Sequence, residues 1–319
     1  MTDQQKTNQI ESFVLATAQR SLTPIKLDEK PLMGEFLHRS GQQADLTYGC
    51  TVGRWASTGP LSKTQPTFAV CLASDSNLIM GQTIKPGCIV VFPAGFTQLS
   101  SFSGRMEYTL LSLPHCNPSE AINHAIGDFP NGFHDHFRIV TPPGDAGKKL
   151  LEVTTELAAD LSHQPRPECK TKAAAPTHDL GAAQLAAIHQ ALQHCDLSVN
   201  PLLTWDSDRC RIVLQAMQYL PMGIENHAFS IDVLVDHIQV SRRTMFRAFH
   251  MVLGMSPSRF LKLYRFTRAR LDLLAAEHGH DKVIDIAYRW GFWEAGRFAL
   301  EYRELFGERP SDTLAATPK

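Results

Sequence analysis

The C-terminal third of the chain repeats its apolar residues with the period of an α-helix, in two copies. Residues 230–237 predict a short helix. Residues 242–253 predict a longer one whose inward stripe is Met245, Phe249 and Val252. A tight turn separates the two helices, so the segment reads as helix, turn and helix.

Four residues of this segment recur 53 positions later with the same character. The pairs are Met245 and Phe298, Phe249 and Tyr302, Gly254 and Gly307, and Pro257 and Pro310. The repeat predicts two helix-turn-helix modules, at about 230–254 and 282–307. Paired modules suit a protein that reads two successive major grooves of double-stranded DNA.

The outward face of the predicted helix 242–253 carries Arg242, Arg243, Arg247 and His250. An arginine there can hold a phosphate or bond bidentately to guanine O6 and N7. Phe246 lies on the flank of this face, where it either packs on a thymine methyl group or completes the core. The interval from Ser241 to Arg270 holds eight basic residues and no acidic one, so we expect an anionic partner to offset their repulsion.

A connector helix is predicted to start at Ser256-Pro257 and to stop near Gly279. The groove-side positions of the second recognition helix are less polar than those of the first, and only one of them is a strong base reader. They are Ala295, Gly296, Arg297 and Leu300. We therefore expect the second module to read less sequence than the first, or to read DNA shape. Its turn has Gly291 where the first copy has Gln239, which would be strained by about 1 kcal/mol if left-handed.

From about Arg209 to Leu314 the chain resembles the DNA-binding domain of the AraC/XylS family of bacterial transcription regulators. The resemblance is carried by SRRTMFRAF (241–249), LGMSP (253–257) and IAYRWGFWEAGRFALEYRELFGERPSDTL (286–314). It implies that groove-side residues of both recognition helices contact bases. By position these are Arg243, Phe246, Arg247 and His250, then Ala295, Gly296, Arg297 and Leu300.

Residues 31–114 consist of short alternating segments punctuated by glycine and proline, which predict a β-barrel or jelly roll. The passage KPGCIVVFPAG (85–95) resembles the cupin-like sensor domain found at the front of many AraC/XylS regulators. The expected fold class is therefore α+β. A barrel-like sensor domain with flanking helices (1–200) precedes an all-α domain of two modules joined by a connector helix (201–319).

The flanking helices are predicted at 1–20, where the pattern looks amphipathic, and at 146–162 and 180–195. The later two either form a dimer interface or pack on the barrel. Sensor domains of the family bind a small molecule and help the protein dimerise. Arg54 and Trp55 are candidates to line such a pocket, and the alternative is a surface arginine beside a core tryptophan.

Charge is divided unevenly along the chain. Residues 209–319 hold 16 basic and 12 acidic side chains, whereas the whole chain of 319 residues has a formal net charge of -1. The seven cysteines form no CxxC pair, and His134-Asp135-His136 and His278-Gly279-His280 bring no further ligands at metal-site spacing. We expect no catalytic residues, metal or cofactor, and we expect a cytoplasmic protein because no signal peptide or long apolar run appears.

These observations predict a DNA-binding transcription regulator, an activator that responds to a small-molecule effector. Its expected partners are double-stranded promoter DNA, the effector, RNA polymerase if it activates, and a second copy of the chain, but no membrane. Two alternatives stay open: a front domain that only dimerises or binds a partner protein, and a cupin-type enzyme with a DNA-binding tail.

Overall fold

The computed structural model describes residues 2–7, 22–41, 43–113, 136–163, 179–195, 197, 206–223, 230–276 and 281–315. Two compact units make up the chain. The first comprises residues 1–23, 32–53 and 59–204, and the second comprises 24–31, 54–58 and 205–319. Among the described helices, none combines the length and apolar composition needed to cross a bilayer.

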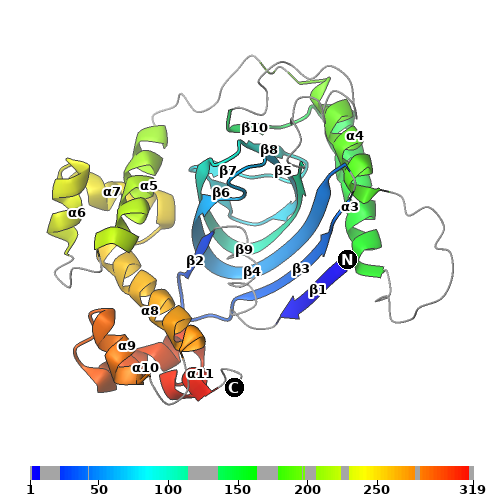
Figure 1. The fold of residues 1–319 in the computed structure, drawn as a ribbon. Helices are drawn as coiled ribbons and strands as arrows, with labels where there is room; N and C mark the ends of the chain where they lie inside the picture. Colours follow the sequence, from blue (N-terminus) through cyan, green and yellow to red (C-terminus); the bar gives the residue numbers. More distant parts are fainter. Residues whose placement is uncertain are drawn as a thin grey trace. The chain divides into compact units, whose positions relative to one another are not determined.

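A single curled sheet holds the described strands of the N-terminal two thirds (Figure 1). Its main path runs β1-β3-β4-β9-β5-β8-β10, with β2, β6 and β7 at the side. The strands are β1 (Thr2–Thr7), β2 (Thr23–Lys26), β3 (Met33–Arg39), β4 (Asp45–Pro60), β5 (Thr67–Ser74), β6 (Leu78–Ile79), β7 (Gln82–Thr83), β8 (Ile89–Phe92), β9 (Thr97–Ser112) and β10 (Arg138–Val140).

The predicted strands are present, and the sheet is antiparallel in the pairs β1–β3, β3–β4, β5–β8, β5–β9 and β8–β10. Strand β8 is buried along its whole length, and Phe92 is only 4% exposed, as its position between two turns predicts. A mixed fold with an N-terminal antiparallel sheet and C-terminal helices is confirmed.

The leading-helix prediction is wrong for residues 2–7. They form strand β1, which pairs antiparallel with β3 from Thr2 opposite Arg39 to Thr7 opposite Gly34. Backbone hydrogen bonds to the edge of the sheet satisfy this segment, and such pairing overrides a local helical pattern. The remainder of that prediction, residues 1 and 8–20, lies outside the described residues.

Helices α3 (Gly144–His163) and α4 (Leu180–Leu192) confirm the two later flanking helices, and they lie side by side in Figure 1. Their apolar faces join one core with the sheet, in which Leu150, Leu157 and Ile188 lie in the same cluster as Phe68 and Ile89. Of the two roles predicted for these faces, packing on the sheet is therefore the one observed. The two helices are also tied together in the core, where Gln184 Nε2 donates to Thr154 Oγ1 at 3.0 Å.

The second unit holds the remaining helices. They are α5 (Asp206–Gly223), α6 (Ile231–Ile238), α7 (Arg242–Leu253), α8 (Pro257–Ala275), α9 (Val283–Arg289), α10 (Ala295–Phe306) and α11 (Pro310–Ala315). Both predicted helix-turn-helix pairs are present, α6 with α7 and α9 with α10, and α8 connects them. Gly279, where the connector was predicted to stop, lies outside the described residues, and α8 ends at Ala275.

Candidate nucleic-acid interface

Helix α7 is fixed at both ends by its own sequence. The Ser241 hydroxyl accepts from the backbone N–H of Thr244 at 3.1 Å, and Gly254 ends the helix in the left-handed region at φ 67°. Met245 and Phe249 are almost fully buried, and Phe249 meets Phe260 edge-on at 5.6 Å. These contacts decide which face of α7 points outward.

The outward face is the predicted one, because Arg242, Arg243, Arg247 and His250 are all exposed. Among the described residues, no acidic side chain forms an ion pair with Arg243 or Arg247. Arg242 differs, since its guanidinium is paired with Asp232 of α6 and lies 5.6 Å from the ring centre of Phe246. Two arginines of this face thus have no ion pair with a described residue, and the third forms an exposed ion pair with a neighbouring helix.

Phe246 is half-buried, which matches its predicted position on the flank. Helix α6 packs against α7. Ser230 caps α6 by accepting from the N–H of Val233, and Leu234 is 2% exposed. The turn that follows has Gln239 at φ 59°, so the left-handed strain considered from the sequence is present.

The connector helix begins as predicted. The Ser256 hydroxyl accepts from the N–H of Arg259 at 3.3 Å, with Pro257 at the first position. The basic run between Ser241 and Arg270 has more acidic partners than its sequence suggests. Acids from outside it pair with four of its cations: Asp232 with Arg242, Glu29 with Arg259, Glu301 with Lys262 and Glu308 with Arg270. The expectation that an anionic partner offsets this run is wrong for these four cations, because folding brings distant carboxylates to them.

In the second module, α10 buries Phe298 and Tyr302, which are 2% and 0% exposed. Gly291 has φ 77°, the conformation that a glycine adopts at low cost. The four groove-side residues follow the turn. Gly296, Arg297 and Leu300 are exposed and Ala295 is half-buried, and a side chain added at Gly296 would meet open space.

Arg297 is the one long polar side chain among these four, and its guanidinium is already engaged. Its Nε lies 3.0 Å from Glu301 Oε1, one helical turn away. The second carboxylate oxygen of Glu301 lies 2.7 Å from Lys262 Nζ of α8. Glu301 was not selected from the sequence, although an acid four residues after an arginine was the available signal.

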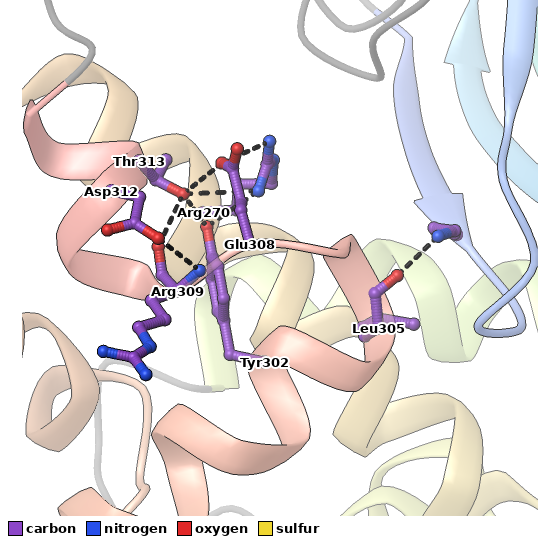
Figure 2. A network of polar contacts seen from close by, with 8 residues as sticks. Arg270, Tyr302, Leu305, Glu308, Arg309, Asp312 and Thr313 are labelled. Carbon is purple, nitrogen blue, oxygen red and sulfur yellow. Dashed lines mark hydrogen bonds and ion pairs between the residues drawn. The ribbon is translucent and has the colours of Figure 1, made fainter.

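A closed ring of polar contacts holds α10 to α8 and α11 (Figure 2). Arg270 donates to Tyr302 Oη at 3.0 Å and pairs with Glu308 at 3.0 Å. The Thr313 hydroxyl donates to Glu308 Oε1 at 2.5 Å, so the Tyr302 hydroxyl donates in turn to Thr313 Oγ1 at 2.8 Å. Burial raises the pKa of Tyr302 to about 12, so the phenol keeps its proton. Each of the four side chains is bonded to at least one other member of the ring, which orients the second recognition helix.

Two cations of the second unit lie at the C-terminal ends of the recognition helices. Arg54 Nη2 donates to the carbonyl of Leu253 at 3.0 Å, and Lys26 Nζ donates to the carbonyl of Leu305 (Figure 2). Burial lowers the pKa of Lys26, and the carboxylates of Asp28 and Glu29 oppose that shift. Helix C-termini carry partial negative charge, so both positions favour a cation.

Arg54 and Trp55, the candidates for an effector pocket, differ from each other in their surroundings. The Arg54 guanidinium contacts α7, and Trp55 is 3% exposed. The cysteines lie in different surroundings. Cys71, Cys88 and Cys210 are buried, whereas Cys50 and Cys195 are half-buried.

Several of the cysteines and of the residues in the two His-x-His motifs lie outside the described part of the chain: Cys116, Cys169, His134, Asp135, His278 and His280. Within the described part, no group of three or more His, Cys, Asp or Glu side chains is arranged to hold a metal ion.

Helices α5 and α11 are the elements of this unit with no counterpart among the helices predicted from the sequence. Helix α5 packs against α6 and α7, and Val213, Ala216 and Leu220 are 0–1% exposed. Their spacing of three and four residues was a usable helical pattern.

Comparison with known proteins places this geometry in a family. Residues 234–316 match the family described as "Helix-turn-helix domain". The chain is 40% identical over 110 residues to a "Probable thc operon regulatory protein" of Rhodococcus erythropolis, which covers 34% of this chain and 32% of that protein. It is 28% identical over 118 residues to "XylDLEGF operon transcriptional activator 3" of Pseudomonas putida, covering 37% of this chain and 35% of that protein.

A solved structure gives a similar result. A probable AraC family transcriptional regulator from Rhodopseudomonas palustris is 34% identical, with a TM-score of 0.31, and covers 34% of this chain and 99% of that one. The chain spans about a third of the length of the curated relatives named above. The double helix-turn-helix domain of this chain belongs to the AraC/XylS family of transcription regulators.

Proposed function

We propose that this chain is a sequence-specific DNA-binding transcription regulator. The observation that carries the proposal is the outward face of α7, where Arg243 and Arg247 are exposed beside His250 in a domain of the AraC/XylS family. Arginines that stand one helical turn apart on a recognition helix can reach neighbouring base edges of one major groove.

Affinity and specificity come from different side chains in this proposal. Arg243, Arg247 and Arg297 read bases, while Phe246, His250, Ala295, Gly296 and Leu300 shape the fit to the grooves. Arg242 contributes mainly through its contacts with Asp232 and Phe246. Contacts to phosphate supply much of the affinity and make it depend steeply on salt.

The proposal extends to the rest of the chain. The N-terminal sheet is a cupin-like sensor that binds a small effector and supports a homodimer, and the chain activates transcription by contacting RNA polymerase. Relatives named as transcriptional activators support the activator role. An effector shifts DNA binding only by its differential affinity for the two states of the protein, so DNA must change effector affinity by the same factor.

Genome-wide DNA occupancy in the native host tests the proposal. We compare the wild-type chain with the triple variant R243A/R247A/R297A. The matched control is K63A/K85A/K149A, which removes the same charge from exposed lysines of the sheet unit and its helices. Discrete promoter peaks should vanish in the first variant and persist in the control. Equal loss in both variants, or no discrete peaks with the wild type, would overturn the proposal.

A second experiment tests effector binding with the purified chain of 319 residues. A metabolite that binds the folded protein raises its melting temperature, and the rise grows with ligand concentration. A metabolite identified in this way should change the affinity for a bound promoter fragment. Promoter fragments that leave the metabolite's affinity unchanged would show that it is not an effector.

A further inference from the structure

A groove of about 500 Å³ in the second unit separates the two modules. Its walls come from the start of α6, one face of α8, and the turn and first half of α10. Among the charged residues that line it are Lys262, Arg265, Arg297, Glu294 and Glu301. Three cations and two carboxylates therefore face the space beside the second recognition helix.

Glu301 pairs with two of the three cations that line this groove. Its side chain is 21% exposed, whereas that of Arg297 is 66% exposed, so the carboxylate is the better-held member of the pair. Oε1 meets Arg297 from the same helix, and Oε2 meets Lys262 from α8. A carboxylate fixed from two helices is a firmer support than an exposed pair one turn apart on a single helix.

The geometry of the Arg297 contact leaves the base-reading edge available. Glu301 engages Nε, and no described residue bonds to Nη1 or Nη2 of Arg297. A guanidinium held at Nε can still present both terminal nitrogens to guanine O6 and N7. Most of the freedom that an exposed arginine loses on binding is then lost beforehand.

Glu301 is also a negative charge close to the predicted path of DNA. Burial by itself would raise the pKa of Glu301, but hydrogen bonds and charge from Lys262 and Arg297 outweigh burial and lower it. The carboxylate is therefore ionised at neutral pH. It forms ion pairs with two cations that would otherwise attract the phosphates of DNA of any sequence.

We propose that Glu301 is a positioning residue that determines specificity: it orients Arg297 for base readout and withholds Arg297 and Lys262 from sequence-independent phosphate contacts. This inference rests on the proposed DNA-binding function. It gives the second module a part in specificity although three of its four groove-side residues are small or apolar.

The test compares the full-length wild-type chain with E301Q and with the matched control E304Q. Glu304 is exposed on the same helix and forms no ion pair with another described residue, so both variants remove one charge from α10. The probes are a duplex that the wild type enriches from a random library and an unselected random-sequence duplex. Dissociation constants for both are measured over a salt series, and melting temperatures report folding.

For E301Q we expect binding to the random duplex to tighten by about three- to tenfold, with a salt slope steeper by about one or two phosphate contacts. Affinity for the enriched duplex should rise less or fall, so the ratio of the two affinities drops. E304Q should change both affinities by the same small factor. In an R297A background, E301Q should no longer lower the ratio, because Glu301 acts on bases through Arg297.

Two results would overturn the inference. One is a ratio that changes equally in E301Q and E304Q, which would make Glu301 an ordinary surface charge. The other is an equal weakening on both duplexes with a lower melting temperature, which would make its role structural. If the wild type enriches no duplex, the proposed function itself fails, and this outcome is distinct from the other two.

Discussion

The two modules of the second unit build the same arrangement of helices with different chemistry at equivalent positions. The ring in the second module is made of Arg270, Tyr302, Glu308 and Thr313. The residues 53 positions earlier are Met217, Phe249, Met255 and Phe260, all 1–4% exposed. The first module therefore has buried apolar side chains at the four positions where the second has a closed polar ring.

The difference shows what each solution provides. Apolar packing tolerates changes of shape and has no directional requirement. The ring of charge and hydroxyl groups is buried except at Glu308, whose side chain is 37% exposed. Such a ring is stable only when its members are paired, so it holds α10 in one orientation. The module with fewer polar groove-side residues is the one whose recognition helix is fixed by directional contacts.

Breaking the ring should give the largest effect. Arg270→Ala leaves Glu308 without its cation and Tyr302 without a donor, and we expect a loss of about 3 kcal/mol of unfolding free energy. Denaturant unfolding followed by circular dichroism measures it, with hydrogen exchange of α10 as a local readout.

The control introduces the chemistry of the first module. R270M/Y302F/E308M replaces three members of the ring by their counterparts, and it should destabilise less than R270A alone. If R270A costs no more than an ordinary surface substitution, the ring is not what fixes α10.

The next largest difference between the modules should be in the loss of DNA affinity when a groove-side residue is replaced. Arg247→Ala should cost about 1–3 kcal/mol on a duplex selected by the wild type and less on random DNA. Leu300→Ala should change both by less than about 0.5 kcal/mol, because a leucine offers no donor to a base edge. Competition binding at fixed salt measures both, with Arg211→Ala as a basic-residue control on α5. Equal losses on both duplexes would make Arg247 a phosphate contact.

The Tyr302 phenol, which has an apolar counterpart in the first module, should make the unfolding free energy depend on pH. Its pKa is about 12 in the fold because of burial, against an ordinary 10.0, so the folded chain holds this proton more tightly than the unfolded chain. This contribution, about 3 kcal/mol, is complete below pH 10 and is lost as the pH rises through 12. Tyr302→Phe should therefore be less sensitive than the wild type to this rise in pH. Parallel curves of unfolding free energy against pH would contradict the assignment.

The turns should give the smallest effect and of opposite sign in the two modules. Gln239→Gly relieves a left-handed non-glycine residue and should stabilise by up to about 1 kcal/mol. Gly291→Gln introduces that strain and should destabilise by about 1 kcal/mol, since the nearest atoms to an added Cβ are at an ordinary 3.7 Å. Thermal unfolding of the two variants measures the pair. Changes of the same sign would show that the side chains, and not the backbone angle, decide the outcome.

Much of this domain could be read from the sequence because its determinants are local. Ser230, Ser241 and Ser256 cap their helices within three residues, and the apolar stripes of α7 and α10 follow the helical period. The outward position of Arg243 and Arg247 follows from those stripes, as does the exposure of Arg297.

Long-range contacts could not be read in this way. The pattern of residues 1–20 predicts a helix, but strand β3 supplies the hydrogen bonds that make residues 2–7 a strand, from more than 25 residues later in the chain. Spacing also gives no indication that Glu308 would meet Arg270, or that Arg54 would meet the end of α7, because those partners are 38 and 199 residues apart.

The sequence by itself determined the repeated helix-turn-helix pattern, its caps and its outward basic face, since each depends on residues within one or two helical turns. Only the tertiary structure decided which cations are free. It paired Arg270 with Glu308 and tied Arg297 and Lys262 to one carboxylate. The physical reason is that charge acts over a few ångströms of space, whatever the separation along the chain.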